Sequence, residues 1–190
     1  TSDDAYKGTE PTDGAEWEAL ENYIWTPQWG DFNIKFRTDY QAISRANAAI
    51  RLVTNTDGLD AEFAKRITAE AKFLRAHYHF DLYKMFKYIP YYTENETDFK
   101  KPNVDEGGNF IDPINDIIKD FQDAANDLPA AQNEKGRVTK GAAQAYLGKA
   151  YLYNKQYAEA KAAFDQVVNS NLYALQDCYH YIFSTLGENG

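Results

Sequence analysis

The sequence contains little cysteine, fewer basic than acidic residues and no long apolar run, and each of these absences excludes a class of protein. A single cysteine among 190 residues permits neither an internal disulfide nor a cysteine-based zinc site. The 20 Lys and Arg residues stand against 29 Asp and Glu residues, a net charge of −9, and form no basic cluster. Nucleic-acid phosphates require such clusters, so we expect no nucleic-acid partner. No apolar run approaches the roughly 20 residues that a membrane-spanning helix needs.

Residue patterns for catalysis or for cofactor binding are also missing. His77 and His79 lie two positions apart in a predicted helix, so they point to different sides and cannot share a metal ion. No phosphate-binding glycine loop, zinc-protease motif or nucleophile elbow occurs. Cys178 has no basic neighbour in sequence that would activate it, and we interpret it as a small buried residue. We therefore expect a protein that is not an enzyme, with no catalytic residue, no metal and no cofactor.

The sequence is instead rich in aromatic residues and in helical periodicity. It holds 15 Tyr, 11 Phe and 3 Trp residues, and most of the Tyr residues fall on apolar stripes, where we expect them to pack in a core. No alternating strand pattern is visible, so the predicted fold is all-α. Helices are expected at about 16–24, 36–53, 60–86, 113–128, 139–154 and 157–169. The helix at 60–86 is apolar on two sides and should therefore be central.

Two further features of this pattern carry structural expectations. Asn47 interrupts an apolar stripe, and a buried amide must be hydrogen-bonded, so we expect it to tie down a neighbouring loop or helix end. The polar segment at 93–112 is long for a connection within a domain, which is typical of a functional or mobile loop. We expect a flexible N-terminal arm at 1–15, a helical domain at 16–175 and an irregular tail at 176–190 that leads to a C-terminal part absent from this sequence.

The segment 139–170 has the spacing of a tetratricopeptide repeat, in which two helices cross closely. The residues that match are Leu147, Gly148, Tyr151, Tyr157, Ala160 and Phe164. Gln144 departs from the pattern, which often has Trp at this position. The earlier helices are expected to stack on this unit as degenerate repeats in a right-handed array. A tetratricopeptide stack by itself favours binding of a peptide or protein.

The aromatic residues between 23 and 32 do not follow helical periodicity. Trp25 and Trp29 lie in a segment that Pro27 and Gly30 mark as a loop. Exposed indole rings are suitable platforms for the apolar face of a sugar ring, and nearby polar side chains can bind its hydroxyls. The alternative is a small satellite core beneath the loop. The candidate glycan-binding residues are Trp25, Trp29, Asp31 and Asn33.

Four segments, in the same order, resemble the SusD/RagB-like proteins. Residues 40–47 resemble the segment Y-x-x-I-x-R-A-N, and residues 70–90 resemble the helix E-A-x-F-L-R-A with its exit F-G-x-V-P, although Lys87 or Tyr88 replaces the glycine. Residues 118–129 resemble I-x-x-D-L-x-x-A-x-x-x-L-P, and residues 136–143 resemble G-R-V-T-K-x-A-A. The resemblance extends over about residues 17–175.

This resemblance implies a lipoprotein that is exposed on the bacterial outer membrane and performs no catalysis. Such a protein binds an oligosaccharide or polysaccharide, or a peptide in the RagB type, and delivers it to a SusC-like TonB-dependent transporter. The implied fold has tetratricopeptide units as a scaffold and irregular loops that carry much of the ligand site. Chains of this family are much longer, and the lipid-bearing cysteine is not in this sequence, so we expect an N-terminal portion. A peptide- or protein-binding tetratricopeptide module is the alternative.

Overall fold

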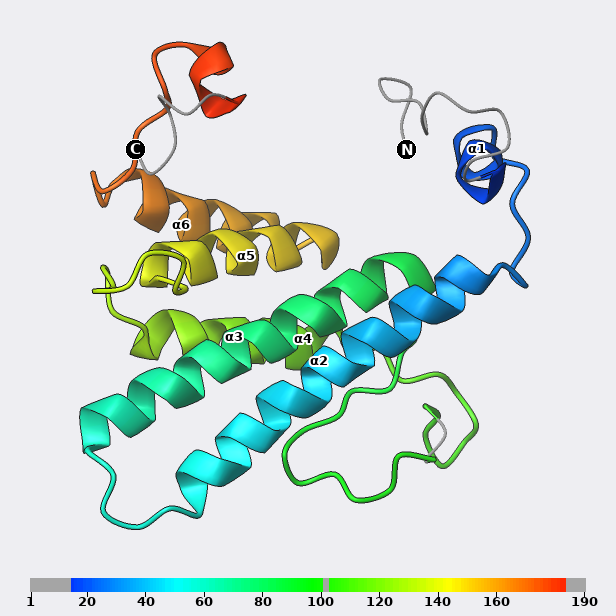
Figure 1. The fold of residues 1–190 in the computed structure, drawn as a ribbon, viewed down its shortest axis with the longest axis horizontal. Helices are drawn as coiled ribbons and strands as arrows, with labels where there is room; N and C mark the ends of the chain where they lie inside the picture. Colours follow the sequence, from blue (N-terminus) through cyan, green and yellow to red (C-terminus); the bar gives the residue numbers. More distant parts are fainter. Residues whose placement is uncertain (1–14, 101–102, 184–190) are drawn as a thin grey trace. The chain divides into compact units, whose positions relative to one another are not determined.

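The computed structural model describes residues 15–100 and 103–183, and in these ranges all the regular elements are helical (Figure 1). The α-helices are α1 (Ala15–Glu21), α2 (Gly30–Thr54), α3 (Ala61–Phe86), α4 (Ile114–Asp127), α5 (Lys140–Tyr153) and α6 (Tyr157–Val168). A short 3-10 helix, η1, spans Tyr179–Phe183. The predicted all-α class is confirmed. The expected N-terminal arm lies almost wholly outside the described residues, as does the end of the tail.

The chain divides into two units, residues 1–41 and 42–190, and the boundary falls within α2. In the second unit, α3 packs on α4, α4 packs on α5, and α5 packs on α6 (Figure 1). The largest buried side chains of this unit include Phe80, Leu82, Ile117 and Phe121. The predicted stacking of earlier helices on the hairpin α5–α6 is therefore confirmed for α3 and α4.

Helix α2 begins earlier than the sequence pattern predicted. The prediction placed its start near Phe36 and treated Gly30 as part of a loop, but the helix starts at Gly30 itself. Phe32, Phe36 and Tyr40 follow one another at four-residue spacing, so their stripe continues into the supposed loop, and the rings of Phe36 and Tyr40 lie 4.7 Å apart. Asp31 in the first turn also favours a helix start, because its charge complements the helix dipole.

The hairpin α5–α6 has the close crossing that the repeat pattern predicted. Thr139 caps α5 by accepting a hydrogen bond from the backbone N–H of Ala142. Gly148 is buried against Phe164, and a Cβ atom at this position would lie 2.6 Å from the Phe164 ring. Only glycine allows the two helices to approach this closely without moving the ring.

We expect Gly148→Ala to lower the free energy of unfolding by about 1–3 kcal/mol, because the added methyl group must displace the Phe164 ring. Alanine otherwise favours a helix interior over glycine, so a loss of stability reports the steric contact. Urea denaturation would measure it. Gly30→Ala is the control, since a Cβ atom there meets nothing within 4 Å. Equal behaviour of the two variants would show that the crossing tolerates a side chain.

The loop between α3 and α4 is fastened to helices of the second unit by a buried polar network. Arg75 is 3% exposed and donates to both carboxylate oxygens of Asp120, from Nε at 2.6 Å and from Nη2 at 2.8 Å. Its Nη1 donates to Asn47 Oδ1 at 2.9 Å and also to Glu94 on the loop. The Tyr91 hydroxyl donates to the same Asp120 carboxylate. The Arg75 side chain therefore joins α2, α3, α4 and the loop.

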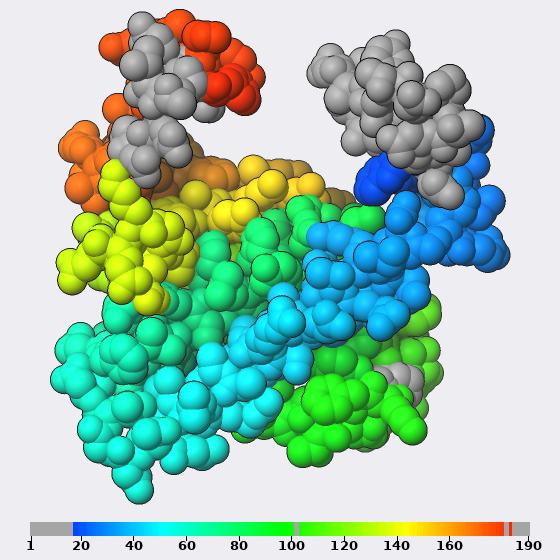
Figure 2. Space-filling view, in the orientation of Figure 1, coloured from blue at the N-terminus to red at the C-terminus, as the bar shows by residue number. Residues whose placement is uncertain are grey.

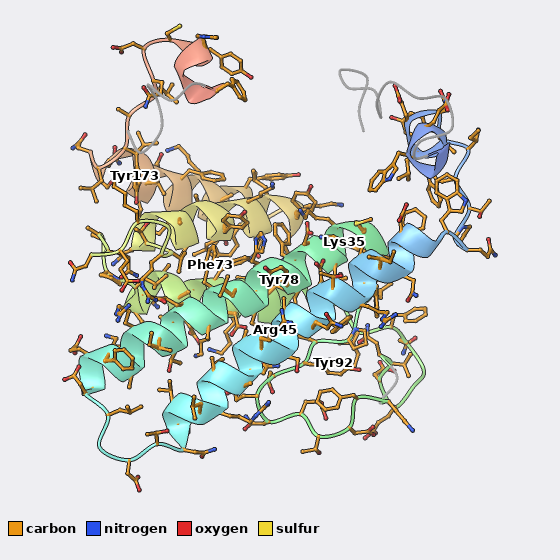
Figure 3. The ribbon with its side chains drawn as sticks, viewed as in Figure 1. Lys35, Arg45, Phe73, Tyr78, Tyr92 and Tyr173 are labelled. Carbon is orange, nitrogen blue, oxygen red and sulfur yellow. The ribbon has the colours of Figure 1, made fainter. Side chains whose placement is uncertain are left out.

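Asn47 completes this attachment in the way its position in the sequence predicted. Its Nδ2 donates to the backbone carbonyl of Tyr92 at 3.0 Å, and Arg51 Nη1 donates to the carbonyl of Glu94 at 3.1 Å. The loop consequently lies beside the second half of α2 (Figure 2). Figure 3 labels Tyr92, the loop residue whose carbonyl accepts this hydrogen bond. At least its first part, residues 91–94, is held by specific bonds.

Burial and charge fix the protonation states within this network. Burial alone would lower the pKa of Arg75, but the hydrogen bonds and charge of Asp120 raise it above its ordinary value. Burial lowers the pKa of His79 to about 3, and the nearby positive charge of Arg75 adds to this shift. Neutral His79 then donates from Nδ1 to the Arg75 carbonyl at 3.0 Å and accepts the Tyr92 N–H at Nε2 at 3.2 Å. His79 is thus a structural residue.

Candidate functional site

The candidate site lies in the first unit, where α1 ends and the chain turns toward α2. The N–H of Ile24 donates to the carbonyl of Ala19 at 2.9 Å, and the N–H of Tyr23 donates to the carbonyl of Leu20 at 3.3 Å. These two bonds form a Schellman motif, which ends a helix with one residue in the left-handed region. That residue is Tyr23, with φ of 57°, where glycine is usual. The ring of Tyr23 is consequently held in solvent, 81% exposed.

Trp25 combines the two interpretations that the sequence left open. Its indole packs edge to face on Phe32, with ring centroids 5.5 Å apart and an interplanar angle of 81°. The side chain is nevertheless 46% exposed. Phe32 therefore supports one side of the indole while much of its surface faces solvent, as a stacking platform requires.

The other three predicted residues, Trp29, Asp31 and Asn33, differ in burial and in position. Trp29 is half-buried, and its N–H donates to the Thr26 carbonyl at 3.2 Å in a turn just before α2. Asp31 is half-buried and Asn33 is exposed, and both lie on the first turns of α2 rather than in a loop. Residues two positions apart on a helix point to different sides. The fold therefore does not direct Asp31 and Asn33 to one common point.

Sequence reasoning missed part of the exposed surface. Trp17 and Ile24 are spaced as on one side of a helix, yet Trp17 is 47% exposed and Ile24 is 69% exposed. Helix α1 has only seven residues, so few neighbouring side chains are available to cover its apolar surface. One signal could have revealed this exposure. The seven-residue helix and the residues just after it hold more large apolar side chains than so short a helix can bury.

The described part of the chain contains neither a cluster of metal-binding side chains nor a membrane-spanning helix. Within residues 15–100 and 103–183, no three His, Cys, Asp or Glu side chains are grouped so that they could hold a metal ion. Nor do these ranges contain a helix of the length and apolarity needed to cross a membrane. Cys178, which was predicted to be buried, is exposed, and it lies in the irregular segment between α6 and η1.

Comparisons with known proteins agree with this fold. A SusD-like family model described as "Starch-binding associating with outer membrane" matches residues 4–152. SusD-like protein P38 of Formosa agariphila is 24% identical over 148 residues, which are 78% of this chain and 27% of that protein. The chain therefore spans about a quarter of the length of this relative.

Solved structures of similar proteins share the helical arrangement. Surface glycan-binding protein A from Bacteroides uniformis aligns with a TM-score of 0.80 at 21% identity, over 96% of this chain and 41% of that one. The homologous protein from Bacteroides thetaiotaomicron, solved in complex with laminarihexaose, gives 0.77 at 19% identity, over 94% and 38%. A laminarin binding SusD-like protein gives 0.66 at 31% identity, over 84% and 34%. Because the family model covers most of the chain, this protein belongs to the SusD-like family.

Proposed function

We propose that this protein binds glycan at the cell surface without catalysis, and that Trp25 is the principal stacking platform. The observation that carries the proposal is an indole that is 46% exposed while its ring centroid lies 5.5 Å from that of Phe32. An exposed indole that is already held by a packing contact offers a large apolar surface to a ligand and loses little side-chain entropy on binding. The family description, which mentions starch binding, supports a carbohydrate as the ligand.

The remaining parts of the proposal rest on family membership. In it, the protein is a surface-exposed lipoprotein of the outer membrane and delivers its glycan to a SusC-like TonB-dependent transporter. The names of the similar proteins that bind laminarin or laminarihexaose make laminarin oligosaccharides the first ligands to test. The proposed organisation has a helical domain at 16–175, with the tetratricopeptide unit at 139–170 as scaffold.

A peptide- or protein-binding module, including peptide uptake of the RagB type, is the second candidate. The observation that favours it is apolar exposure on the hairpin α5–α6. The exposed side chains there are Leu152, Tyr153, Tyr157 and Val168. Leu152, Tyr153 and Tyr157 lie near the turn between the two helices, where a packed partner would cover them.

A panel of oligosaccharides that includes laminarihexaose, and a panel of short peptides, would be titrated into the purified protein by calorimetry. Glycan binding with the oligosaccharide recovered intact is the expected result. Recovery of shortened products would contradict the non-catalytic assignment, and binding of peptides alone would favour the second candidate.

We expect Trp25→Ala to weaken binding of the oligosaccharide about five- to tenfold, which corresponds to roughly 1 kcal/mol for one lost stacking contact. Trp29→Ala should have a smaller effect because Trp29 is more covered. Trp17→Ala is the matched control, since Trp17 is 47% exposed and Trp25 is 46% exposed. Unchanged affinity in the Trp25 variant would remove this residue from the site.

A further inference from the structure

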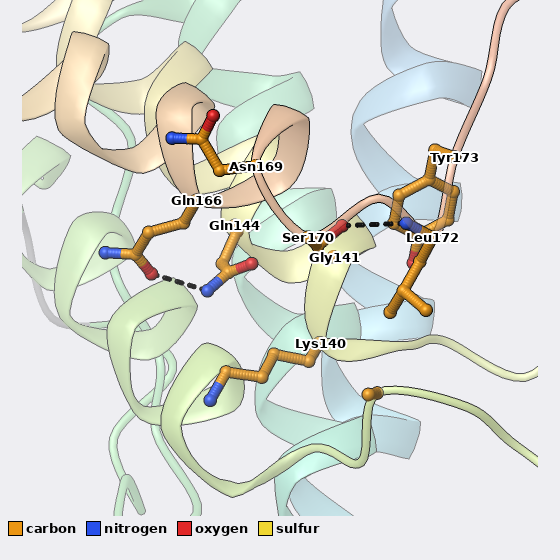
Figure 4. Close-up of a pocket in the computed structure, with 9 residues that line it drawn as sticks. Lys140, Gly141, Gln144, Gln166, Asn169, Ser170, Leu172 and Tyr173 are labelled. Carbon is orange, nitrogen blue, oxygen red and sulfur yellow. Dashed lines mark hydrogen bonds between the residues drawn. The ribbon is translucent and has the colours of Figure 1, made fainter.

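A pocket on the hairpin α5–α6 is not used by the proposed glycan platform. It has a volume of about 320 Å³ and lies between the first turns of α5, the end of α6 and the segment that follows α6 (Figure 4). The residues that line it are Ala130, Lys140, Gly141, Gln144, Gln166, Asn169, Ser170, Leu172 and Tyr173. Its volume is at the lower end of the range found for small-molecule sites.

Two residues of α5 shape the pocket. Gln144 stands where the tetratricopeptide pattern often has Trp, so an amide replaces an indole. Gly141 is buried beneath Tyr173, and a Cβ atom at Gly141 would lie 2.5 Å from that ring. The Tyr173 hydroxyl is 3.0 Å from Thr139 Oγ1, which fixes the ring as one wall.

Gln144 presents its amide oxygen to this space from a side chain that is otherwise largely buried. The residue is 8% exposed, and its Nε2 donates to Gln166 Oε1 at 2.5 Å. No residue of the described chain donates a hydrogen bond to Gln144 Oε1, and Figure 4 shows this oxygen turned away from Gln166, on the side of Ser170 and Tyr173. This oxygen is accessible to solvent, so it can accept a hydrogen bond from a ligand hydroxyl as it does from water.

The accessible lining is mostly apolar, with one aromatic wall and a few polar groups. Lys140, Gln166 and Asn169 supply donors, the amides supply acceptors, and Tyr173 is half exposed beside them. Vicinal hydroxyls of a sugar both donate and accept, and amide side chains match this property, whereas a purely apolar ligand would leave Gln144 Oε1 unsatisfied.

We propose that this pocket is a second carbohydrate subsite, which holds one sugar ring between Tyr173 and the amide groups of Gln144, Gln166 and Asn169. The choice of a sugar rests on the proposed function, whereas the site itself is separate from Trp25. Gln144→Trp is the decisive variant, because it restores the residue that such repeats usually have and fills the pocket with an indole. It is therefore expected to fold.

The test is a titration of isotope-labelled protein with glucose, galactose, mannose and glucuronate at millimolar concentrations, followed through the side-chain amide signals of Gln144, Gln166 and Asn169. At least one sugar is expected to shift these signals. The shifts should disappear in Gln144→Trp and persist in Lys149→Trp, which adds the same indole at an exposed position of α5. They should also persist in Trp25→Ala.

The outcomes separate this inference from the proposed function. If the shifts persist in Trp25→Ala and the affinity for the oligosaccharide does not depend on Trp25, the proposed role of Trp25 is wrong and the subsite in the pocket is supported. Absence of shifts with all four sugars, or shifts that remain in Gln144→Trp, would overturn the subsite even if the platform binds. Shifts caused by tri-alanine but by none of the sugars would overturn it in favour of a peptide site.

Discussion

Replacing Asp120 with Ala is expected to lower the free energy of unfolding by about 3–5 kcal/mol. The change leaves the Arg75 guanidinium, 3% exposed, without the carboxylate that accepts two of its hydrogen bonds. Arg75 cannot escape by losing its proton, because arginine remains charged in proteins. The Tyr91 hydroxyl loses its acceptor as well. Chemical denaturation of the variant and of the parent protein would measure the difference.

Asp123 on the same helix provides a matched control. It forms an ion pair with Lys72 at 2.7 Å, but these two side chains are 27% and 26% exposed, so water compensates for the loss of either partner. We expect Asp123→Ala to cost less than about 1 kcal/mol. Similar small losses in both variants would mean that the buried network does not hold the loop between α3 and α4.

The second large effect is a loss of stability in mild acid that arises from His79. The ordinary pKa of histidine is 6.5, and burial lowers that of His79 in the folded protein to about 3. Between these values the unfolded chain binds a proton that the folded protein does not, so stability falls as pH falls. From pH 6.5 to pH 4.5, where an ordinary glutamate is half protonated, the contribution of His79 amounts to roughly 2–3 kcal/mol.

The variant His79→Gln should have a flatter dependence of stability on pH in that interval, even if its stability at neutral pH is lower. Below it, Glu94 contributes in the same direction, because its burial is outweighed by the hydrogen bond from Arg75, which lowers the Glu94 pKa. His180→Gln is the control, since His180 is exposed on η1. An unchanged slope in His79→Gln would show that His79 takes up its proton without unfolding.

The sequence predicted those parts of the fold that depend on local spacing. The limits of α3, α4, α5 and α6 agree with the predictions to within one or two residues, because each of these helices has a continuous apolar stripe and a recognisable start or stop. Asn47 was expected to tie a loop, and it does so through Tyr92. The small residue at Gly148 was expected at a close helix crossing, where it is found.

Features that depend on tertiary partners could not be predicted in this way. Arg75 and Asp120 lie 45 positions apart on helices full of charged residues, and nothing in their local spacing shows that they meet in the interior. The start of α2 was misplaced because Gly30 was taken as a breaker, and this error assigned Asp31 and Asn33 to a loop. Tyr23 at positive φ could not be foreseen, since that conformation normally selects glycine.

The binding role of the candidate residues stays a prediction, and the structure gives only their placement. Trp25 is exposed, as the interpretation as a stacking platform required. Its contact with Phe32 also fits the other interpretation, a small satellite core. Trp17 was not named as a candidate, yet it is as exposed as Trp25. Sequence spacing describes which residues share a helix face, but a helix of seven residues does not have enough neighbours to bury that face.

The most direct test of the central claim, that the surface of Trp25 binds glycan, uses the indole N–H signals of the chain's 3 Trp residues. Each signal would be assigned with a Trp→Phe variant, and the signals would be followed while the oligosaccharide that binds best in the panel is added. The account predicts a saturable shift of the Trp25 signal, a smaller one for Trp29 and little change for Trp17. Saturable binding that leaves the Trp25 signal unmoved would contradict it.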